Sequence, residues 1–191
     1  MTPDQQKLLN FIELIDQYKN VFRIIYLDNK KRLENDAEHS WHVAMMVWLF
    51  APQYEQKINL EKCLKMALFH DLVEIYTGDV SAFDQKGRIG KAEREAKSAK
   101  KLFNQLPSQA KKEFFELFDE YEEKQTAEAK FVQALDKLQP IIQNNLSKGV
   151  MWKDYQITPE LAEKNKKPHT THSKFLLSLL KELLTRARKF S

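Results

Sequence analysis

Residues 37–51 read AEHSWHVAMMVWLFA. Apart from its two histidines and a few small or acidic residues, this segment is apolar on almost every face of a helix, and helices of that kind lie at the centre of a protein. Asn35 or Asp36 can cap its N-terminus, and Pro52 ends it. A second helix, expected over residues 60–76, is also apolar nearly all round. These two helices are therefore expected to form the core.

The chain contains few residues that break helices or form turns, with 4 Gly and 6 Pro among its 191 residues. Average usage would give roughly 20 of the two together. Because β-hairpins need such residues in their turns, the composition argues against a many-stranded β fold. It predicts an all-α helical bundle in a single domain over residues 1–191. A C-terminal helix at about 170–190 is expected to pack on the rest of this domain.

Hydrophobic periodicity predicts further helices on either side of this pair. Their expected ranges are 4–19, 91–105, 108–124 and 126–147. Between helices we expect three irregular connections, namely a polar linker over 28–36, a loop over 77–90, and a loop containing Trp152 and Pro159.

Several classes of protein are disfavoured by the sequence. No apolar run reaches the roughly 18 residues that a membrane span needs, and the N-terminus has no signal-peptide pattern. A single cysteine, Cys63, allows no intrachain disulfide. The net charge of +4 is small, and the lysines of residues 91–105 alternate with Glu93 and Glu95, as on a solvated helix. We expect a cytoplasmic protein that binds neither membrane nor nucleic acid.

Charged residues interrupt the two most apolar helices. In the 60–76 helix, His70, Asp71 and Glu74 share a stripe, and the 37–51 helix carries His39 and His42. A buried carboxylate needs a counter-charge, hydrogen bonds or a metal, and imidazole with carboxylate suits Mn, Fe, Co, Ni or Zn. His70 can equally be a core histidine paired with Asp71, so the residues alone leave both interpretations open.

An ordered set of short motifs resembles a known family. The set comprises Ala37-Glu38-His39-Ser40-Trp41, His70-Asp71 followed by Glu74, Gly78-Asp79, and Asp136 in Ala134-Leu135-Asp136-Lys137-Leu138. Over roughly residues 10–155 the chain is similar to the HD-domain metal-dependent phosphohydrolases, and within them to the branch of the bacterial 5′-deoxynucleotidases.

The resemblance implies a role for each motif residue. The ligands of one divalent cation (Mn, Co, Mg, Ni, Fe or Zn) would be His39, His70, Asp71 and Asp136. Glu74 would act as general acid or base, and Asp79 would lie near the substrate sugar. Periodicity alone predicts a solvated Asp136, because it lies off the apolar stripe of its helix. His42 is not required by the pattern and is expected beside a ligand or in the core.

Arg23 resembles an arginine that this branch uses to bind the substrate phosphate. A guanidinium suits this task because it can donate two hydrogen bonds to a phosphate at once. Arg23 can equally be a surface arginine. The sequence departs from the branch at Ile24, where the branch has tryptophan, and in a connecting loop that is one residue longer. Selectivity for deoxyribose therefore stays open.

The expected activity is hydrolysis of a (deoxy)nucleoside 5′-monophosphate to nucleoside and phosphate. Two alternatives remain: an HD phosphohydrolase acting on a cyclic or pyrophosphate-bearing nucleotide, or a helical binding module without catalysis. Three of the four glycines lie in the 77–90 loop, which is expected to be mobile and to face the substrate. The resemblance also implies a homodimer.

Overall fold

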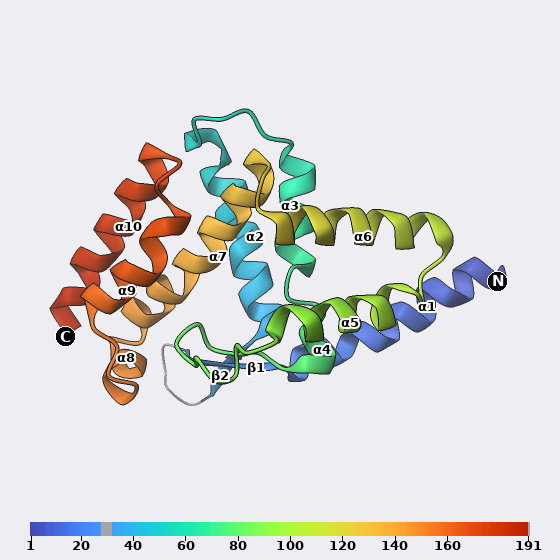
Figure 1. Cartoon of the computed structure of the whole chain (residues 1–191), viewed down its shortest axis with the longest axis horizontal. Helices are drawn as coiled ribbons and strands as arrows, with labels where there is room; N and C mark the ends of the chain where they lie inside the picture. The colour runs from blue at the N-terminus through green and yellow to red at the C-terminus, as the bar shows by residue number, and fades with distance from the viewer. Residues whose placement is uncertain (28–31, 191) are drawn as a thin grey trace.

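A computed structural model describes residues 1–27 and 32–190; residues 28–31, part of the expected polar linker, lie outside the described residues. The described chain contains ten α-helices, a two-stranded ribbon and short 3-10 turns (Figure 1). The elements are α1 (Pro3–Ile15), β1 (Phe22–Tyr26), β2 (Leu33–Asn35), α2 (Asp36–Phe50), α3 (Leu60–Phe69), α4 (Glu74–Thr77), α5 (Lys91–Phe103), α6 (Ser108–Glu123), α7 (Ala127–Leu146), α8 (Val150–Asp154), α9 (Pro159–Lys166) and α10 (Lys174–Ala187).

Helices α2, α3 and α7 pack against one another and form the centre of the molecule (Figure 1). The buried apolar side chains of these helices include Val43, Val47, Met66, Leu135 and Leu138. Burial of such side chains contributes most of the stabilisation of a fold of this size. The prediction of an all-α fold in a single domain, with the 37–51 helix at its core, is confirmed.

The start of α2 is fixed by a capping box. The side chain of Asn35 accepts a hydrogen bond from the backbone N–H of Glu38, and the Glu38 carboxylate accepts one from the backbone N–H of Asn35. This reciprocal pair satisfies two N–H groups that the first turn leaves without partners. The cap is the one expected, and it holds His39 in the first turns of the helix.

The helix expected over residues 60–76 is not continuous. The α-helix ends at Phe69, and the next hydrogen bonds, from Leu72 N to Phe69 O and from Glu74 N to Asp71 O, span three residues instead of four. In this tighter geometry, residues three apart lie one above the other, so Asp71 and Glu74 still share a side. Gly78 follows α4 with a φ of +71°, in the region that favours glycine.

Two segments expected to be irregular are ordered. Strand β2, inside the linker expected over 28–36, pairs antiparallel with β1, with Phe22 opposite Asn35. The loop expected around Trp152 and Pro159 contains α8 and α9. Helix α9 begins with a threonine cap, in which Thr158 accepts a hydrogen bond from Leu161 N, and with Pro159 at its first position. Both are ordinary signals for a helix start, so this prediction was wrong.

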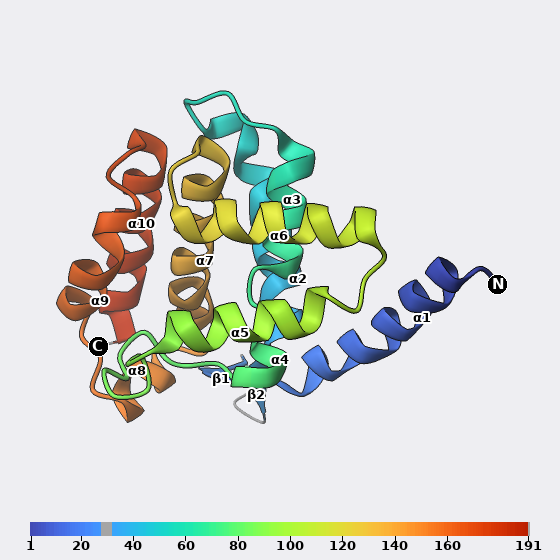
Figure 2. The same ribbon diagram turned by 45° about the vertical axis from the view of Figure 1, so that its right-hand side comes forward.

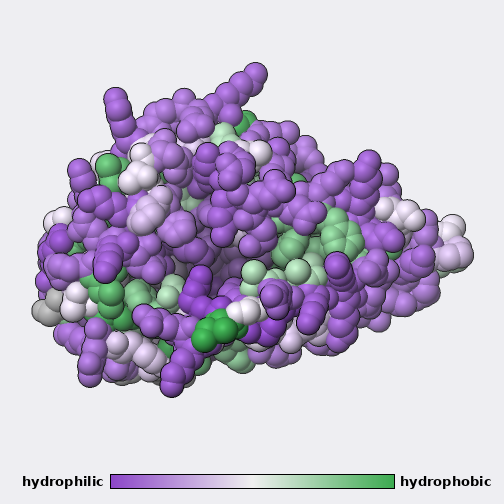
Figure 3. Space-filling view, in the orientation of Figure 1, coloured by the Kyte–Doolittle hydropathy of each residue, from purple (hydrophilic) through white to green (hydrophobic). Residues whose placement is uncertain are grey.

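The ends of the chain lie on opposite sides of the molecule. Helix α1 projects from the body, and α8, α9 and α10 cluster at the other end (Figures 1 and 2). Leu176, Leu180 and Leu184 of α10 are buried, and this helix contacts α7. The face in Figure 3 is mainly hydrophilic, with hydrophobic residues in small patches. Across the described residues, every helix is too short or too polar to cross a bilayer.

Candidate metal centre

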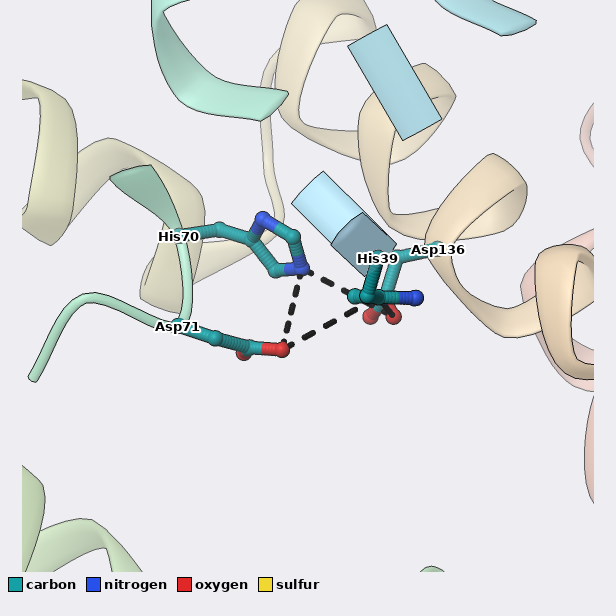
Figure 4. Close-up of side chains that lie close together, drawn as sticks. All are labelled: His39, His70, Asp71 and Asp136. Carbon is teal, nitrogen blue, oxygen red and sulfur yellow. Dashed lines mark hydrogen bonds and ion pairs between the residues drawn. The ribbon is translucent and has the colours of Figure 1, made fainter. Parts of the chain in front are cut away.

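The four predicted metal ligands come together at one point, where their side chains face one another (Figure 4). His39 comes from α2, His70 and Asp71 from the turn after α3, and Asp136 from α7. One ligand atom of each residue lies within 4.8 Å of those of the others. His39 Nε2 is 3.1 Å from Asp136 Oδ1 and 3.9 Å from Asp71 Oδ2, and His70 Nε2 is 3.2 Å from Asp71 Oδ2. Segments up to 97 residues apart therefore contribute to one cluster.

The donor atoms suit a divalent cation. Nδ1 of His39 lies 3.0 Å from Gln139 Oε1, and Nδ1 of His70 lies 2.9 Å from the carbonyl oxygen of Ala67. Both oxygens accept hydrogen bonds, so each ring donates through Nδ1 and presents Nε2 to the cluster. The buried Nε2 of His70 has no hydrogen-bond partner among the described residues. Two imidazole nitrogens and two carboxylate oxygens form a donor set typical of Mn, Fe, Co, Ni or Zn.

The charges of the cluster are set by burial and by neighbouring residues. Burial, reinforced by the Arg23 charge, lowers the pKa of His39 to about 4, which keeps this ring neutral. Burial also disfavours charge on His70, but the Asp71 and Asp136 carboxylates together outweigh it and raise the pKa of His70 to about 10. Burial opposes ionisation of Asp136 as well, yet the Lys137 ammonium, 2.6 Å away, together with His39 and His70 holds the pKa of Asp136 well below the usual range. A cation bound here would replace the proton of His70.

Glu74 lies beside the cluster and is 1% exposed. Its Oε1 accepts a hydrogen bond from Lys91 Nζ at 2.9 Å, and its Oε2 is buried without a partner in the described chain. Burial and the nearby Asp71 charge raise the pKa of Glu74 well above its usual range, although Lys91 acts in the opposite direction. The carboxyl group can therefore hold a proton at a pH where most glutamates are ionised, as an acid–base catalyst requires.

Arg23 on β1 connects the acidic residues around the cluster. Its Nη1 donates to Asp71 Oδ2 at 2.9 Å and to Asp36 Oδ1 at 3.3 Å, and lies 3.7 Å from Asp79 Oδ1. Only 11% of its side chain is exposed, so it is not a surface arginine. The structure thus brings Arg23 and Asp79, both expected near the substrate, to the same place as Asp71.

A cavity of about 450 Å³ opens next to the cluster. Asp71 and Asp136 line it together with Glu74, Arg23 and Asp79. The rest of its wall comes from β1, the 77–90 loop, the start of α5, α7, α9, and α8 with the residues that follow it. It includes the aromatic side chains of Phe83, Trp152 and Tyr155. This volume falls within the range of small-molecule sites. The loop that was expected to face a substrate does line this cavity.

The chain matches the family model described as HD domain over residues 15–175. The chain belongs to the HD-domain family. This HD-domain protein is 34% identical over 139 residues to the human protein named 5′-deoxynucleotidase HDDC2, covering 72% of this chain and 67% of the relative. It is 30% identical over 141 residues to 5′-deoxynucleotidase hdd1 of Schizosaccharomyces pombe, covering 71% and 70%.

A solved structure extends the likeness along nearly the whole chain. It is the crystal structure of a predicted metal-dependent phosphohydrolase from Magnetospirillum magnetotacticum, which is 36% identical to this HD-domain protein with a TM-score of 0.90. The superposition covers 98% of this chain and 94% of that one. The family resemblance found in the sequence is therefore confirmed.

Three residues of this HD-domain protein that contact the cluster were not found by sequence reasoning. Gln139 contacts His39, and both Lys137 and Tyr121 donate to Asp136 Oδ2, at 2.6 and 3.1 Å. None of them stands out, because glutamine, lysine and tyrosine are common on solvated helices. His42 contacts Gln139, the partner of His39, with its Nδ1 3.2 Å from Gln139 Nε2.

Proposed function

We propose that this protein is a divalent-metal-dependent phosphohydrolase that converts (deoxy)nucleoside 5′-monophosphates to nucleoside and inorganic phosphate. The observation that carries the proposal is the convergence of the two-histidine, two-aspartate cluster on a cavity that also holds Glu74 and Arg23. The names of the human and fission-yeast relatives, both 5′-deoxynucleotidases, support this substrate class. The solved relative, named for metal-dependent phosphohydrolysis, supports the reaction.

His39, His70, Asp71 and Asp136 would hold the cation. When bound, such a cation polarises a phosphoryl oxygen and lowers the pKa of a water molecule. Glu74 faces the same cavity and holds or transfers one proton, either taking it from the attacking water or giving it to the departing sugar oxygen. Lys91 keeps Glu74 Oε1 oriented through their 2.9 Å hydrogen bond.

Arg23 and Asp79 would bind the substrate. The guanidinium of Arg23 provides donors for phosphate oxygens beside the cluster, and the Asp79 carboxylate can accept a hydrogen bond from a sugar hydroxyl. The aromatic side chains of Phe83, Trp152 and Tyr155 give the cavity a wall on which a nucleobase can pack. Ile24 also lines the cavity, so the position that differs from the deoxynucleotidase branch is close enough to affect the choice between ribose and deoxyribose.

The proposal is tested by phosphate release from deoxynucleoside and ribonucleoside 5′-monophosphates, with added Mn²⁺ or Co²⁺ and with a chelator. We expect metal-dependent release that the His70→Ala and Asp71→Ala variants lose. Cyclic and pyrophosphate-bearing nucleotides are assayed in parallel. Turnover of these alone would assign the protein to the alternative phosphohydrolase class. Metal-independent binding of nucleotide without turnover would identify a binding module and contradict the proposal.

We further propose that the protein is a cytoplasmic homodimer whose chain functions as one domain. Trp41 and Trp48, seven residues apart on the same face of α2, are 63% and 59% exposed, and Leu49 beside them is 65% exposed. Large apolar side chains gathered on one helix are typical of a protein interface. Light scattering should give the mass of two chains for the wild type, and the mass of one chain for the double variant Trp41→Glu, Trp48→Glu.

The proposed cytoplasmic location is tested by fractionation of cells that produce the protein.

A further inference from the structure

Lys166 is a buried lysine in the wall of the cavity. It is the last residue of α9, it is 4% exposed, and it lines the cavity together with residues of the metal cluster. Its Nζ lies 5.7 Å from the centre of the Phe83 ring. Within residues 1–27 and 32–190, no carboxylate forms an ion pair with it. A lysine is almost never this buried unless it is paired, so its surroundings are unusual.

The other buried or half-buried cations that line the cavity already have carboxylate partners. Nη1 of Arg23 lies 2.9 Å from Asp71 Oδ2, Nζ of Lys91 lies 2.9 Å from Glu74 Oε1, and Nζ of Lys137 lies 2.6 Å from Asp136 Oδ2. Each of these three cations thus has a carboxylate partner whether or not a substrate is bound. Lys166 differs from all three, because its charge is left for a group that enters the cavity.

The electrostatics around Lys166 also favour an anion. Burial lowers the pKa of Lys166 to about 7, and the positive charge of Lys137 adds to this effect. A phosphomonoester carries between one and two negative charges near neutral pH. Bound in the cavity, its phosphate would offset both the desolvation of the ammonium and the repulsion between the two lysines.

We propose that Lys166 is a substrate-binding residue whose ammonium group donates a hydrogen bond to a phosphate oxygen of the bound nucleotide. This inference rests on the proposed function and deepens it. With this contact, α9 is part of the phosphate site. The substrate that fits is then a dianionic phosphate monoester and not a neutral ligand. Phe83, packed beside the ammonium, limits the access of water and so strengthens the contact.

Binding of inorganic phosphate to the Co²⁺-loaded protein, followed by calorimetry, tests the proposal without turnover. Lys166→Met keeps the length of the side chain and removes its charge, and Lys166→Arg restores a cation. Lys164→Met, at an exposed position of the same helix, is the matched control. We expect the phosphate Kd to rise about tenfold or more in Lys166→Met, as for loss of a hydrogen bond to a charged group. It should recover largely in Lys166→Arg and stay unchanged in Lys164→Met.

Kinetics and competition locate the contact on the substrate. In Lys166→Met we expect KM for a deoxynucleoside 5′-monophosphate to rise with kcat nearly unchanged, and inhibition by the free deoxynucleoside to stay as in the wild type. Circular dichroism and the melting temperature show whether the variant is folded, and removing a buried unpaired charge should not destabilise it.

Several results would overturn the proposal: an unchanged phosphate Kd in Lys166→Met, a loss confined to deoxynucleoside binding, or no phosphate binding by the metal-loaded wild type. If the wild type hydrolyses no nucleotide yet binds phosphate through Lys166, the proposed function fails while the phosphate site stands.

Discussion

Gln139 on α7 holds His39 on α2 in the orientation that a metal ligand needs. Oε1 of Gln139 lies 3.0 Å from Nδ1 of His39, and Nε2 of Gln139 donates to Glu34 Oε1 at 2.6 Å. Because the carboxyl group of Glu34 takes the amide N–H, the amide oxygen must face His39. That oxygen fixes the proton of the imidazole on Nδ1 and leaves the Nε2 lone pair toward the cluster.

Gln139→Leu should therefore weaken metal binding about 10–100-fold, as is typical when a group that orients a ligand is removed. Titration calorimetry with Mn²⁺ or Co²⁺ measures the effect. Gln143→Leu is a matched control, since Gln143 is buried one turn further along α7 but donates to the backbone of Tyr26. Equal metal affinities in the two variants would contradict the role given to Gln139.

Metal binding should stabilise the fold, because the four ligands connect α2, the turn after α3, and α7. A ligand at a hundred times its Kd adds about 2.7 kcal/mol to the free energy of unfolding. For a chain of this size, that should raise the melting temperature by about 5–10 °C. Differential scanning calorimetry with and without Co²⁺ checks the value. Asp136→Asn should melt at nearly the same temperature in both conditions; a full metal-induced shift in this variant would remove Asp136 from the ligand set.

Lys91→Met should move one limb of the pH–rate profile. The Lys91 charge lowers the pKa of Glu74, which burial and Asp71 raise, so removing the lysine raises that pKa further. The limb of the pH–rate profile that reports the ionisation of Glu74 therefore moves toward higher pH, whether the reaction needs Glu74 protonated or ionised.

The pH profile of kcat/KM for Lys91→Met is compared with the profile for Lys97→Met, a control variant at an exposed position on the same helix. Glu74→Gln should lose about 10²–10⁴-fold in rate. A profile of Lys91→Met that coincides with that of the wild type would show that Glu74 does not control the rate.

Arg23→Met should destabilise the protein strongly. Asp36 is fully buried, and Arg23 is its ion-pair partner at 3.3 Å. Removing one member of a buried ion pair costs about 3–5 kcal/mol. Arg32→Met breaks the exposed Arg32–Glu38 pair instead and should cost at most about 1 kcal/mol. The two variants are compared by urea unfolding at pH 8, where the aspartates are more fully ionised. Equal urea midpoints for Arg23→Met and Arg32→Met would contradict the prediction.

Much of the fold was predictable because the central helices carry clear apolar patterns. The boundaries of α2 follow from the Asn35 cap and from Pro52, and those of α7 from its apolar stripe. The break after Phe69 was not predictable, because the apolar residues Leu72, Val73 and Ile75 keep a helical spacing while the hydrogen bonds change span. The β1–β2 ribbon and α8 are short, and such elements depend on packing against α7 more than on their own propensity.

The candidate site was predictable only in part. His39, His70, Asp71 and Glu74 stand out because they are charged or polar residues within apolar helices. Asp136 does not, and periodicity placed it on a solvated face with Gln139 and Gln143. That face is buried because Glu34 and the backbone of Tyr26 accept hydrogen bonds from these glutamines. A polar face covered by a polar ribbon cannot be distinguished from a solvated one by hydropathy.

The cavity wall is continued beyond α7 by α8 and α9, and this fixes the order in which the site can form during synthesis. All four residues of the metal cluster, together with Glu74, precede residue 140 in the chain. The segment that carries Trp152 and Lys166 is made after them. A chain that stops after α7 retains every residue of the metal cluster but lacks one side of the substrate cavity. The metal ligands and the wall of the substrate cavity thus come from different lengths of the same polypeptide.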